Sequence, residues 1–478
     1  MASFYVQNFG CRATQADGAA IEQQFRQRGL EQASNPGAAE WLVLNTCAVT
    51  AAAEQDARAA IRRAQRQNPG CRIVVTGCYA QRAPQEVAAL PGVTSVIGNS
   101  HKNDLAEIAL RQASPSFIPV ADLGMRDTAA ESGAEIFVSD IFAHTQLLAA
   151  PVFDSANERT RPNLKIQDGC NNRCSFCIIP SVRGRSRSLN PDEVLRQVTD
   201  LVSSGYREIV ISGINLGRWG RDLEPSTVSG GRPRPPKLEE LVEKTLAQTP
   251  LEKLRISSVE PMDWTDSFIQ LMAQSPRIAK HAHVPMQSGS DSVLRRMHRK
   301  YRPWHYREKI EKIRAAMPTA AIGADVMVGF PGETDAEFEE TRQMIEGVPF
   351  TYLHVFTFSA RPGTPAATMR AQVPVHIARE RNRILRALAD GKKREFMHSF
   401  IGRELEAITL DRDSDRTAGG CDNRAAVSLA PPSSLRRCTS ALTDNYLKLN
   451  LRGTHPPNRW LRARIEAVEQ DRLVGRVA

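Results

Sequence analysis

Three cysteines lie within eight residues at Cys170, Cys174 and Cys177, in the spacing Cys-x3-Cys-x2-Cys. Thiolates hold iron–sulfur clusters, and three of them bind three irons of a cubane while the fourth iron keeps an open position. That iron can take the amino and carboxylate groups of S-adenosylmethionine (SAM), and an electron from the cluster then breaks a carbon–sulfur bond of the sulfonium. A closed zinc site is the alternative, but it needs a fourth ligand that no nearby His or Cys supplies. The spacing therefore predicts a [4Fe-4S] cluster that cleaves SAM.

Three further cysteines each follow a short apolar segment in the first hundred residues. Cys11, Cys47 and Cys78 lie 36 and 31 residues apart, about one strand–helix unit each. The preceding segments are typical of buried parallel strands covered by helices. These strands are predicted at residues 4–9, 41–44 and 73–75. Because the carboxyl ends of parallel strands meet at one edge of a sheet, we expect the three thiols to converge there.

The other three cysteines have no comparable setting. Cys71 comes before the predicted strand at 73–75, at its wrong end for the cluster, and we expect it to pack in the core. Cys421 and Cys438 receive the same interpretation. An odd total of nine cysteines over 478 residues argues against a disulfide framework. The N-terminus lacks a secretory signal, and no apolar run approaches the ~20 residues that cross a bilayer, so we expect a cytoplasmic protein.

The length and the alternating apolar pattern predict an α/β protein with three domains. We place an N-terminal parallel α/β domain at residues 1–123, a linker at 124–155 and a central domain at 156–395. The central strand and helix signals alternate as in a partial TIM-like β/α barrel. The short alternating segments of 396–478 indicate a small antiparallel β-barrel.

The charge is unevenly distributed along the chain. The net charge is +10, and residues 391–478 hold 16 Lys and Arg against 11 Asp and Glu, which is half of that excess. A basic small barrel suits RNA, which is polyanionic. We therefore expect a nucleic-acid partner and no membrane partner.

The central cysteine segment resembles the radical SAM superfamily, whose signature has this spacing and an aromatic residue before the last Cys, here Phe176. Four later segments resemble the methylthiotransferase branch of that superfamily. They are IIPSVRGRSRS at 178–188, VPMQSGS at 284–290, MHRKY at 297–301 and DVMVGFPGET at 325–334. The resemblance covers almost the whole chain and implies an enzyme that transfers a methylthio group.

In that family three N-terminal cysteines hold a second [4Fe-4S] cluster, and Cys11, Cys47 and Cys78 match them. The second cluster is thought to carry the sulfur, which one SAM methylates before a second SAM yields the radical. Radical chemistry suits the target, because an adenine C2–H is not acidic enough for a side-chain base near neutral pH. The resemblance thus implies two clusters and SAM as cofactors, an electron donor such as flavodoxin or ferredoxin, and a sulfur source.

The resemblance also implies that certain residues at or near the carboxyl ends of the central strands lie close to SAM. They are Gly213, Asn215, Ser257, Ser258, Glu260, Gln287 and Asp325. Small and polar residues there let a cofactor approach the backbone, although such residues also serve as caps and turns. Arg183, Arg185 and Arg187 are predicted to contact substrate or SAM, with a solvated basic patch as the alternative. We assign no catalytic side chain, because the clusters and SAM carry the chemistry.

The family divides by substrate, which is isopentenyladenosine in tRNA, threonylcarbamoyladenosine in tRNA or an aspartate of a ribosomal protein. The second branch is favoured by NFGCR at 8–12, QAD at 15–17, GCYAQ at 77–81, KIQDGC at 165–170 and RGRSRS at 183–188. Thr14 replaces an asparagine and Gly18 a serine of that branch, which bears on a hydrogen bond near Cys11. We predict methylthiolation of C2 of N6-threonylcarbamoyladenosine at position 37 of tRNA. A non-catalytic iron–sulfur RNA-binding protein is the alternative of a different class.

The C-terminal barrel resembles the TRAM module, an RNA-binding fold, through LTDNY at 442–446 and VGR at 474–476. In this hypothesis the barrel holds the anticodon arm of tRNA. Adenosine 37 then enters between the two clusters, unstacked from its neighbours.

Overall fold

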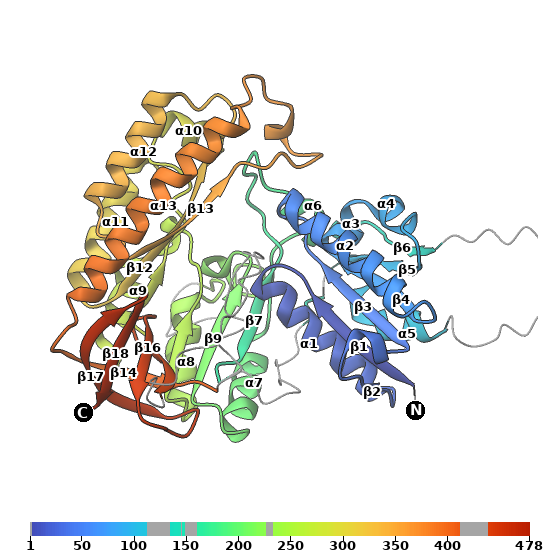
Figure 1. Cartoon of the computed structure of the whole chain (residues 1–478), viewed down its shortest axis with the longest axis horizontal. Coiled ribbons are helices and arrows are strands. Elements are labelled where there is room, and N and C mark those ends of the chain that lie inside the picture. The colour runs from blue at the N-terminus through green and yellow to red at the C-terminus, as the bar shows by residue number, and fades with distance from the viewer. Residues whose placement is uncertain (1, 112–133, 145, 149–159, 226–232, 412–437) are drawn as a thin grey trace, which may run out of the picture.

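The computed structural model describes residues 2–111, 134–144, 146–148, 160–225, 233–411 and 438–478. In Figure 1 the N-terminal sheet lies on the right, the central strands and helices lie in the middle and upper left, and a small barrel lies at the lower left. None of the described helices is long and apolar enough to span a membrane. Cys421 lies outside the described residues, as does most of the predicted linker at 124–155.

The N-terminal unit is a sheet buried on both faces. Its strands, in spatial order, are β2 (Glu31–Gln32), β1 (Ser3–Asn8), β3 (Trp41–Thr46), β4 (Arg72–Gly77), β5 (Val93–Ile97) and β6 (Glu135–Phe137). Every pairing between neighbours is parallel. Successive side chains of a strand face opposite sides, so Leu42 and Leu44 enter one core while Trp41 and Val43 enter the other. The predicted parallel α/β domain is confirmed.

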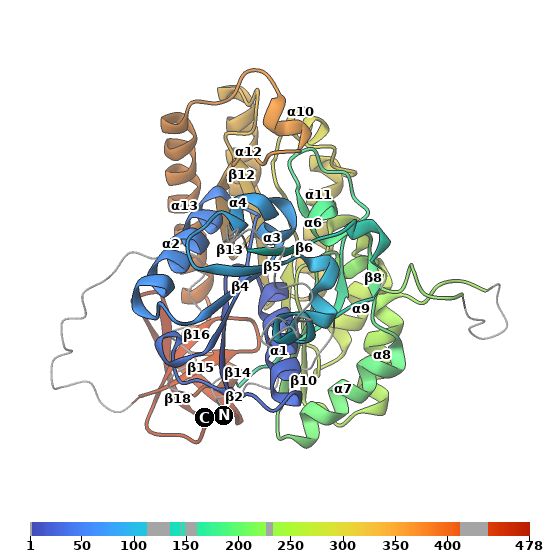
Figure 2. The same ribbon diagram turned by 90° about the vertical axis from the view of Figure 1, so that its right-hand side faces the viewer.

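Helices cover both faces of this sheet, which faces the viewer in Figure 2. They are α1 (Arg12–Gln27), α2 (Ala51–Gln67), α3 (Cys78–Arg82), α4 (Pro84–Ala88) and α5 (Leu105–Arg111). Helices α1 and α5 contribute to one core, and α2, α3 and α4 to the other. Strand β6 falls in the stretch predicted as a linker, and its pairing with β5 extends the sheet beyond residue 123.

The central unit is an open arc of parallel strands. Its two hydrogen-bonded parts are β10 (Lys253–Ile256), β9 (Glu208–Gly213), β7 (Asn163–Asp168) and β8 (Arg187–Ser188), and then β11 (His281–His283), β12 (Ala321–Val328) and β13 (Tyr352–Thr357). Only the short β8 runs antiparallel to its neighbour. The Val259 amide donates to the His283 carbonyl at 3.1 Å, which connects the two parts behind β10 and β11. The arc is the predicted partial β/α barrel.

Helices pack on the convex side of this arc. They are α7 (Pro191–Ser203), α8 (Leu238–Gln248), α9 (Asp266–Gln274), α10 (Asp291–Arg296), α11 (Pro303–Ala316), α12 (Asp335–Gly347) and α13 (Val375–His398). Alternate strand residues such as Leu254, Ala282 and Val326 enter the hydrophobic core shared with the helices. The residues between them therefore face the concave side, as His283 and Asp325 do. A barrel interior is ordinarily filled with branched apolar side chains, so a polar concave wall marks a binding surface.

The C-terminal unit is a closed five-stranded barrel. Its strands, in spatial order, are β14 (Glu404–Thr409), β15 (Cys438–Thr443), β16 (Lys448–Arg452), β18 (Arg472–Val477) and β17 (Trp460–Glu469). All neighbours are antiparallel except β16 and β18, which pair in parallel. Met397 and Phe400, at the end of α13, insert into the barrel core. The predicted TRAM-like barrel is confirmed, with one parallel pair that the sequence did not indicate.

Candidate active site

The central cysteines occupy one loop that begins where β7 ends. Gly169 precedes Cys170 and has φ = +71°, a conformation that favours glycine. A Cβ on Gly169 would collide with the carbonyl oxygen of Arg185, so the loop also needs glycine for space. The Cys170 amide donates to the Gly184 carbonyl at 3.1 Å, which closes this loop against the segment after Cys177.

The thiols of this loop are close neighbours and receive hydrogen bonds. Asn215 Nδ2 lies 3.5 Å from Cys170 Sγ, and Arg299 Nη1 lies 3.3 Å from Cys174 Sγ. Burial, together with the nearby sulfurs of Cys174 and Cys170 and against a backbone hydrogen bond that lowers it, raises the pKa of Cys177 to about 12. A bound metal would reverse this cost by taking up the thiolate charge. The donors and the shared position of the thiols fit ligands of an iron–sulfur cluster.

The N-terminal cysteines follow three adjacent strands of the sheet. Cys11 comes after β1 at the start of α1, Cys47 follows β3, and Cys78 begins α3 directly after β4. Gly77 has φ = +97°, and a Cβ there would collide with the backbone of Thr46. The glycine therefore lets the chain turn sharply into Cys78 beside the end of β3.

The structure brings the three N-terminal thiols together, as predicted from the strand ends. Burial and the charges of Cys78 and Cys11 together raise the pKa of Cys47 to about 12. Asn99 Nδ2 lies 3.7 Å from Cys78 Sγ. Among the described residues, no three His, Cys, Asp or Glu side chains gather as ligands of one metal ion. Ligands of a cubane bind separate irons, so each trio of grouped thiols fits a cluster.

Thr14 and Gly18, the two departures from the family pattern, both lie in α1, which starts directly after Cys11. Thr14 Oγ1 lies 3.5 Å from Cys11 Sγ, so the threonine keeps a polar contact with this thiol. Gly18 lies in α1 against the side chain of Asn8, and a Cβ at position 18 would collide with it. Cys71 is buried in the hydrophobic core beside α2, where we expected it to pack.

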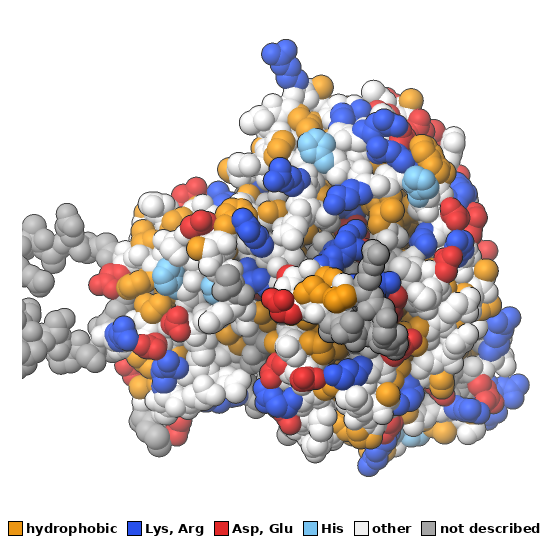
Figure 3. Space-filling model, turned by 180° about the vertical axis from the view of Figure 1, so that it is seen from behind, with side chains coloured by type: hydrophobic (Ala, Val, Ile, Leu, Met, Phe, Trp, Pro, Cys, Tyr) orange, Lys and Arg blue, Asp and Glu red, His pale blue; other side chains and the backbone are white. Residues whose placement is uncertain are grey.

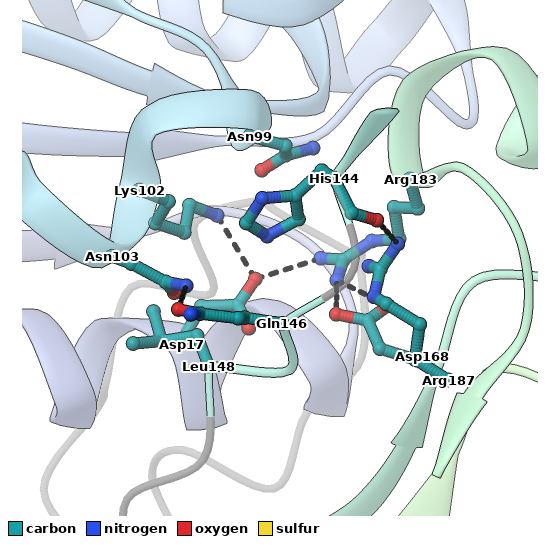
Figure 4. A pocket seen from close by; sticks show the side chains of 10 residues that line it. All are labelled: Asp17, Asn99, Lys102, Asn103, His144, Gln146, Leu148, Asp168, Arg183 and Arg187. Carbon is teal, nitrogen blue, oxygen red and sulfur yellow. Dashed lines mark hydrogen bonds and ion pairs between the residues drawn. The ribbon is translucent and has the colours of Figure 1, made fainter. Parts of the chain in front are cut away.

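A buried ion-pair network lies between the two trios and joins the two domains (Figure 4). Lys102 Nζ is 2.9 Å from Asp17 Oδ2, and Lys165 binds both Asp17 and Asp168. The Arg183 guanidinium donates to Asp17 at 2.9 Å and to Asp168 at 3.0 Å. Burial alone would raise the pKa of Asp17, but Lys102, Lys165 and Arg183 lower it well below its ordinary range. The network therefore stays ionised and fixes α1 against β7.

Arg183 belongs to this network and is only 2% exposed, so the alternative of a solvated basic patch is wrong for this residue, while its contact with substrate or SAM stays a prediction. Its helix, α6 (Ile179–Arg183), starts two residues after Cys177. Ile178 and Val182 pack in the N-terminal core that contains Cys78 and Tyr79. Of the other two arginines, Arg187 is also buried and Arg185 is exposed. The short α6 thus links the two cysteine trios directly.

Three of the seven residues predicted near SAM lie next to the central loop. The Asn215 backbone amide donates to Gln167 Oε1 at 2.7 Å, and Gly213 lies against the same Gln167 side chain. The buried Asn215 Oδ1 has no hydrogen-bond partner among the described residues, and neither has the neighbouring Ser212 Oγ. Glu260 binds Arg299, the residue that contacts Cys174. Unpaired buried polar atoms beside a cysteine loop fit a polar ligand such as SAM.

A second group of predicted residues meets at His283. Ser258 Oγ lies 2.7 Å from His283 Nδ1, and Asp325 Oδ1 lies 3.5 Å from His283 Nε2. Burial alone would raise the pKa of Asp325, but its contact with His283 lowers it. The Gln287 backbone amide donates to the Asp325 carbonyl at 2.8 Å. Ser257 directly follows β10, and its backbone amide donates a hydrogen bond to the Ile211 carbonyl of β9.

Sequence reasoning did not single out Arg299, His283 or Gln167. Arg299 was only part of a resemblance motif, although a buried arginine beside a thiolate is a functional arrangement. His283 and Gln167 were not recognised as site residues because they lie inside predicted strands. The available signal was the alternation within β7 and β11, where polar residues alternate with buried apolar ones.

Comparisons with known proteins agree with this architecture. Residues 164–345 match the radical SAM superfamily, and residues 3–98 match the uncharacterized protein family UPF0004. Two structures of the radical S-adenosylmethionine methyltransferase TsrM from Kitasatospora setae, one with tryptophan and a SAM analog and one with cobalamin and a [4Fe-4S] cluster, share the fold. Their TM-scores are 0.53 and 0.54 at 14% identity, over 77% of this chain and 75% and 77% of theirs. The fold and the cysteine loop define a radical SAM enzyme.

Relatives with similar sequences narrow this class. The threonylcarbamoyladenosine tRNA methylthiotransferase MtaB of Bacillus subtilis (strain 168) is 37% identical over 95% of this chain and 91% of its own length. The protein of the same name from Rickettsia prowazekii is 35% identical over 84% of this chain and 86% of its own. A tRNA-2-methylthio-N(6)-dimethylallyladenosine synthase from Acidothermus cellulolyticus is 32% identical over 87% of this chain and 79% of its own. The chain belongs to the threonylcarbamoyladenosine tRNA methylthiotransferase family.

Family membership confirms the predicted enzyme class, and it confirms the cofactors at the level of the family, since radical SAM enzymes use a [4Fe-4S] cluster and SAM.

Proposed function

We propose that this enzyme attaches a methylthio group to C2 of N6-threonylcarbamoyladenosine at position 37 of tRNA. The observation that carries the proposal is that α6, which starts two residues after Cys177, packs in the core that contains Cys78, while the ion pairs of Arg183 also join the two domains. Arg183 acts electrostatically on Asp17 and Asp168 and also on the thiols of Cys78 and Cys11. Two trios joined through buried contacts suit a reaction that needs both a radical and a sulfur donor at one base.

In this proposal Cys170, Cys174 and Cys177 hold the cluster that, with SAM bound, supplies the radical. Arg299 donates a hydrogen bond to Cys174 Sγ, and Glu260 holds the Arg299 guanidinium in place. A charge-assisted hydrogen bond of this kind is stronger than one between neutral groups. Arg299 and Glu260 therefore position and stabilise a ligand of the cluster.

We assign Cys11, Cys47 and Cys78 as the ligands of the second cluster, which supplies the sulfur. Thr14 and Asn99 supply polar contacts to two of these thiols. For SAM we propose contacts with Gly213, Asn215, Ser257, Ser258, Glu260, Gln287 and Asp325. Their support is their common position on the concave wall and the unpaired atoms of Ser212 and Asn215.

We propose that the C-terminal barrel grips the anticodon arm of tRNA. Arg459, Arg462 and Arg464 are exposed on or beside β17. Lys and Arg side chains also spread over the rear face of the molecule, where Asp and Glu lie among them (Figure 3). Changing the three arginines together to glutamine should weaken tRNA binding and lower its salt dependence, by about one unit of slope for each lost phosphate contact. Unchanged affinity and slope would contradict this role of the barrel.

The remaining assignments complete the proposal. The domains are 1–123, 156–395 and 396–478, joined by 124–155, with β6 of that segment added to the N-terminal sheet. A cytoplasmic enzyme of this kind requires an electron donor such as flavodoxin or ferredoxin and a source of sulfur.

Mass spectrometry of tRNA nucleosides from cells that lack this chain tests the substrate. We expect 2-methylthio-N6-threonylcarbamoyladenosine to disappear and its unmethylthiolated precursor to accumulate. Loss of the isopentenyladenosine derivative instead, or loss of a modified ribosomal-protein aspartate with normal tRNA, would overturn the choice of substrate. Failure of the reduced, reconstituted protein to cleave SAM into methionine and 5′-deoxyadenosine would overturn the reaction itself.

A further inference from the structure

All three domains meet on the concave side of the central arc, at strand positions that precede the residues assigned to SAM. Arg12, from the N-terminal domain, donates to the Tyr446 hydroxyl of the C-terminal barrel at 3.2 Å. The Tyr446 ring lies 4.6 Å from the ring of His281 on β11, measured between centroids. Arg255, on β10, donates to the carbonyl oxygens of Asp444 and Thr443. We name Arg12, His281, Tyr352 and Tyr446 the junction pocket.

Gly323 on β12 has no side chain, which lets an aromatic ring of β13 lie over this position. Gly323 pairs with His283 on one side and with Tyr352 on the other. A Cβ on Gly323 would collide with the Tyr352 ring, which instead lies across the glycine. The Tyr352 hydroxyl therefore reaches His281 Nε2 at 2.7 Å, and the two rings stack with an interplanar angle of 7°.

The His281 ring presents an unused hydrogen-bonding atom in this setting. His281 is 5% exposed, and its Nδ1 has no hydrogen-bond partner among the described residues. Burial and the charges of Arg255 and its neighbours hold the pKa of His281 well below 6.5, so the ring is neutral. If Tyr352 donates to Nε2, the proton of neutral His281 resides on Nδ1, which becomes a donor. A buried donor without a partner indicates a ligand that carries an acceptor.

The charges around the pocket favour an anionic acceptor. Arg12, Arg161 and Arg255 surround it, whereas Glu208 alone pairs with Arg161 and Arg255. Asp444 is paired with Lys253 at 3.3 Å, and on the pKa of Tyr352 the charge of Arg12 outweighs the opposing charge of Asp325. Burial would raise the pKa of Tyr446, yet Arg12 and the other two arginines lower it overall. A phenol that becomes more acidic despite burial reports a positive potential.

Arg12 also has the right position to act on a substrate. It is exposed, and it directly follows Cys11, which we assign to the second cluster. Its charge acts on Tyr352 and His354 of β13 as well as on Tyr446. His354 lies opposite Asp325 in the pairing of β12 and β13, two residues above Tyr352. If the adenine of position 37 lies beside His354, its N6 substituent would thus extend along β13 toward Tyr352 and the junction pocket.

We propose that the junction pocket binds the carboxylate of the N6-threonylcarbamoyl group, with Arg12, the Tyr446 hydroxyl and His281 Nδ1 as its donors. This inference rests on the proposed function and names the feature that selects its substrate. An isopentenyl group carries no acceptor, so it would leave these donors unpaired and desolvated, which disfavours it. The pocket needs contributions from all three domains, and it places the base between the two cysteine trios.

Binding of matched RNAs to the reconstituted protein tests the pocket. The probes are anticodon stem-loops of one sequence that carry N6-threonylcarbamoyladenosine, its carboxylate methyl ester or isopentenyladenosine at position 37. We expect the native protein to bind the free carboxylate about ten- to a hundredfold more tightly than the ester, as for a charge-assisted hydrogen bond. Arg12→Gln and Tyr446→Phe should each reduce this preference toward one while retaining affinity for the ester.

Arg196→Gln is the matched control, because this exposed arginine lies on α7, which packs on the convex side of the arc, and pairs with Glu193. It should lower the affinities of all three RNAs equally or leave them unchanged, and it should keep the preference. Iron content and the visible spectrum of Arg12→Gln should match those of the native protein, which separates a pocket effect from loss of the cluster.

The preference and the reaction are scored separately. If the native enzyme methylthiolates the threonylcarbamoyl RNA but Arg12→Gln and Tyr446→Phe keep the full preference, the pocket is overturned and the proposed function stands. If the native enzyme modifies only the isopentenyl RNA, both are overturned. Loss of the preference in the two pocket variants, with the reaction intact in the native enzyme, supports both.

Discussion

Cys170, Cys174 and Cys177 occupy a single loop after one strand, whereas Cys11, Cys47 and Cys78 end three neighbouring strands. The first trio needs only one loop to keep its thiols together. The second trio depends on the register of β1, β3 and β4, so any change that shifts one of these strands moves a ligand. A site within one loop thus tolerates changes elsewhere in the domain, while the geometry of a site assembled from three strands changes with any shift of the sheet.

The largest effects should come from removing one ligand of each trio. We expect Cys174→Ala to abolish both SAM cleavage and methylthio transfer. Cys47→Ala should abolish transfer but retain SAM cleavage, because it removes only the sulfur-supplying centre. Iron content should fall by about half in either variant. Chromatography of 5′-deoxyadenosine and mass spectrometry of the RNA measure the two activities.

Cys71→Ala is the control for both changes, since Cys71 is buried in the same core as Cys78 but belongs to neither trio. It should retain iron and both activities. Loss of SAM cleavage in Cys47→Ala with a fully loaded central loop would show that the two trios do not divide the chemistry in this way.

The ion-pair network between the trios should give the next largest effect, on stability. Asp17→Asn leaves Lys102 and Lys165 buried without full compensation, so we expect a loss of about 3–5 kcal/mol of unfolding free energy. Urea unfolding followed by circular dichroism measures it. The exposed pair of Glu380 with Arg383 supplies the control, and Glu380→Gln should leave the unfolding free energy almost unchanged. Equal effects of the two variants would contradict a structural role of the network.

The same network predicts a pH dependence. Folding lowers the pKa of Asp17 below its ordinary value of about 3.9, so its ion pairs stabilise the protein fully above that value. This contribution is lost as the pH falls below about 3.9 toward the lowered pKa. The stability difference between the native protein and Asp17→Asn should therefore be constant near neutral pH and shrink in acid. A difference that grows in acid would have the wrong sign.

Glycines at the entrance of each trio should give intermediate and selective effects. Gly77→Ala forces a side chain into a positive φ and against Thr46, and Gly169→Ala does so against Arg185. Each should cost about 1–3 kcal/mol. Gly169→Ala should impair SAM cleavage, whereas Gly77→Ala should impair only methylthio transfer. Unselective loss in both variants would mean that the trios are coupled more tightly than their separate loops suggest.

The smallest effect is expected at Thr14, whose hydroxyl lies beside Cys11. Thr14→Val keeps the branched shape and removes one polar contact, so unfolding free energy should change by less than about 1 kcal/mol. SAM cleavage should not change. Urea titration together with the ratio of methylthiolated RNA to 5′-deoxyadenosine checks both statements, and a large loss of SAM cleavage would contradict them.

The sequence allowed both trios to be predicted, for different reasons. The central one follows from spacing alone, and the N-terminal one from the rule that parallel strands end at a common edge. The burial of Arg183 could not be predicted, because its partner Asp17 lies 166 residues away in another domain. The contact of Arg299 with Cys174 spans 125 residues and depends equally on the tertiary fold. Strand β6 was missed because three residues carry too little pattern to separate a strand from a linker.

The position of α6 has a consequence for exchanging parts between relatives. A cut in the segment at 124–155 looks like a natural place to swap the N-terminal domain, yet Ile178 and Val182 pack in that domain's own core. A chimaera joined there would pack the native α6 against the sheet of another protein, and the side chains of the two would fit poorly beside Cys78. In functional hybrids, residues 178–183 should therefore come from the same protein as the N-terminal domain, even though they lie inside the central domain.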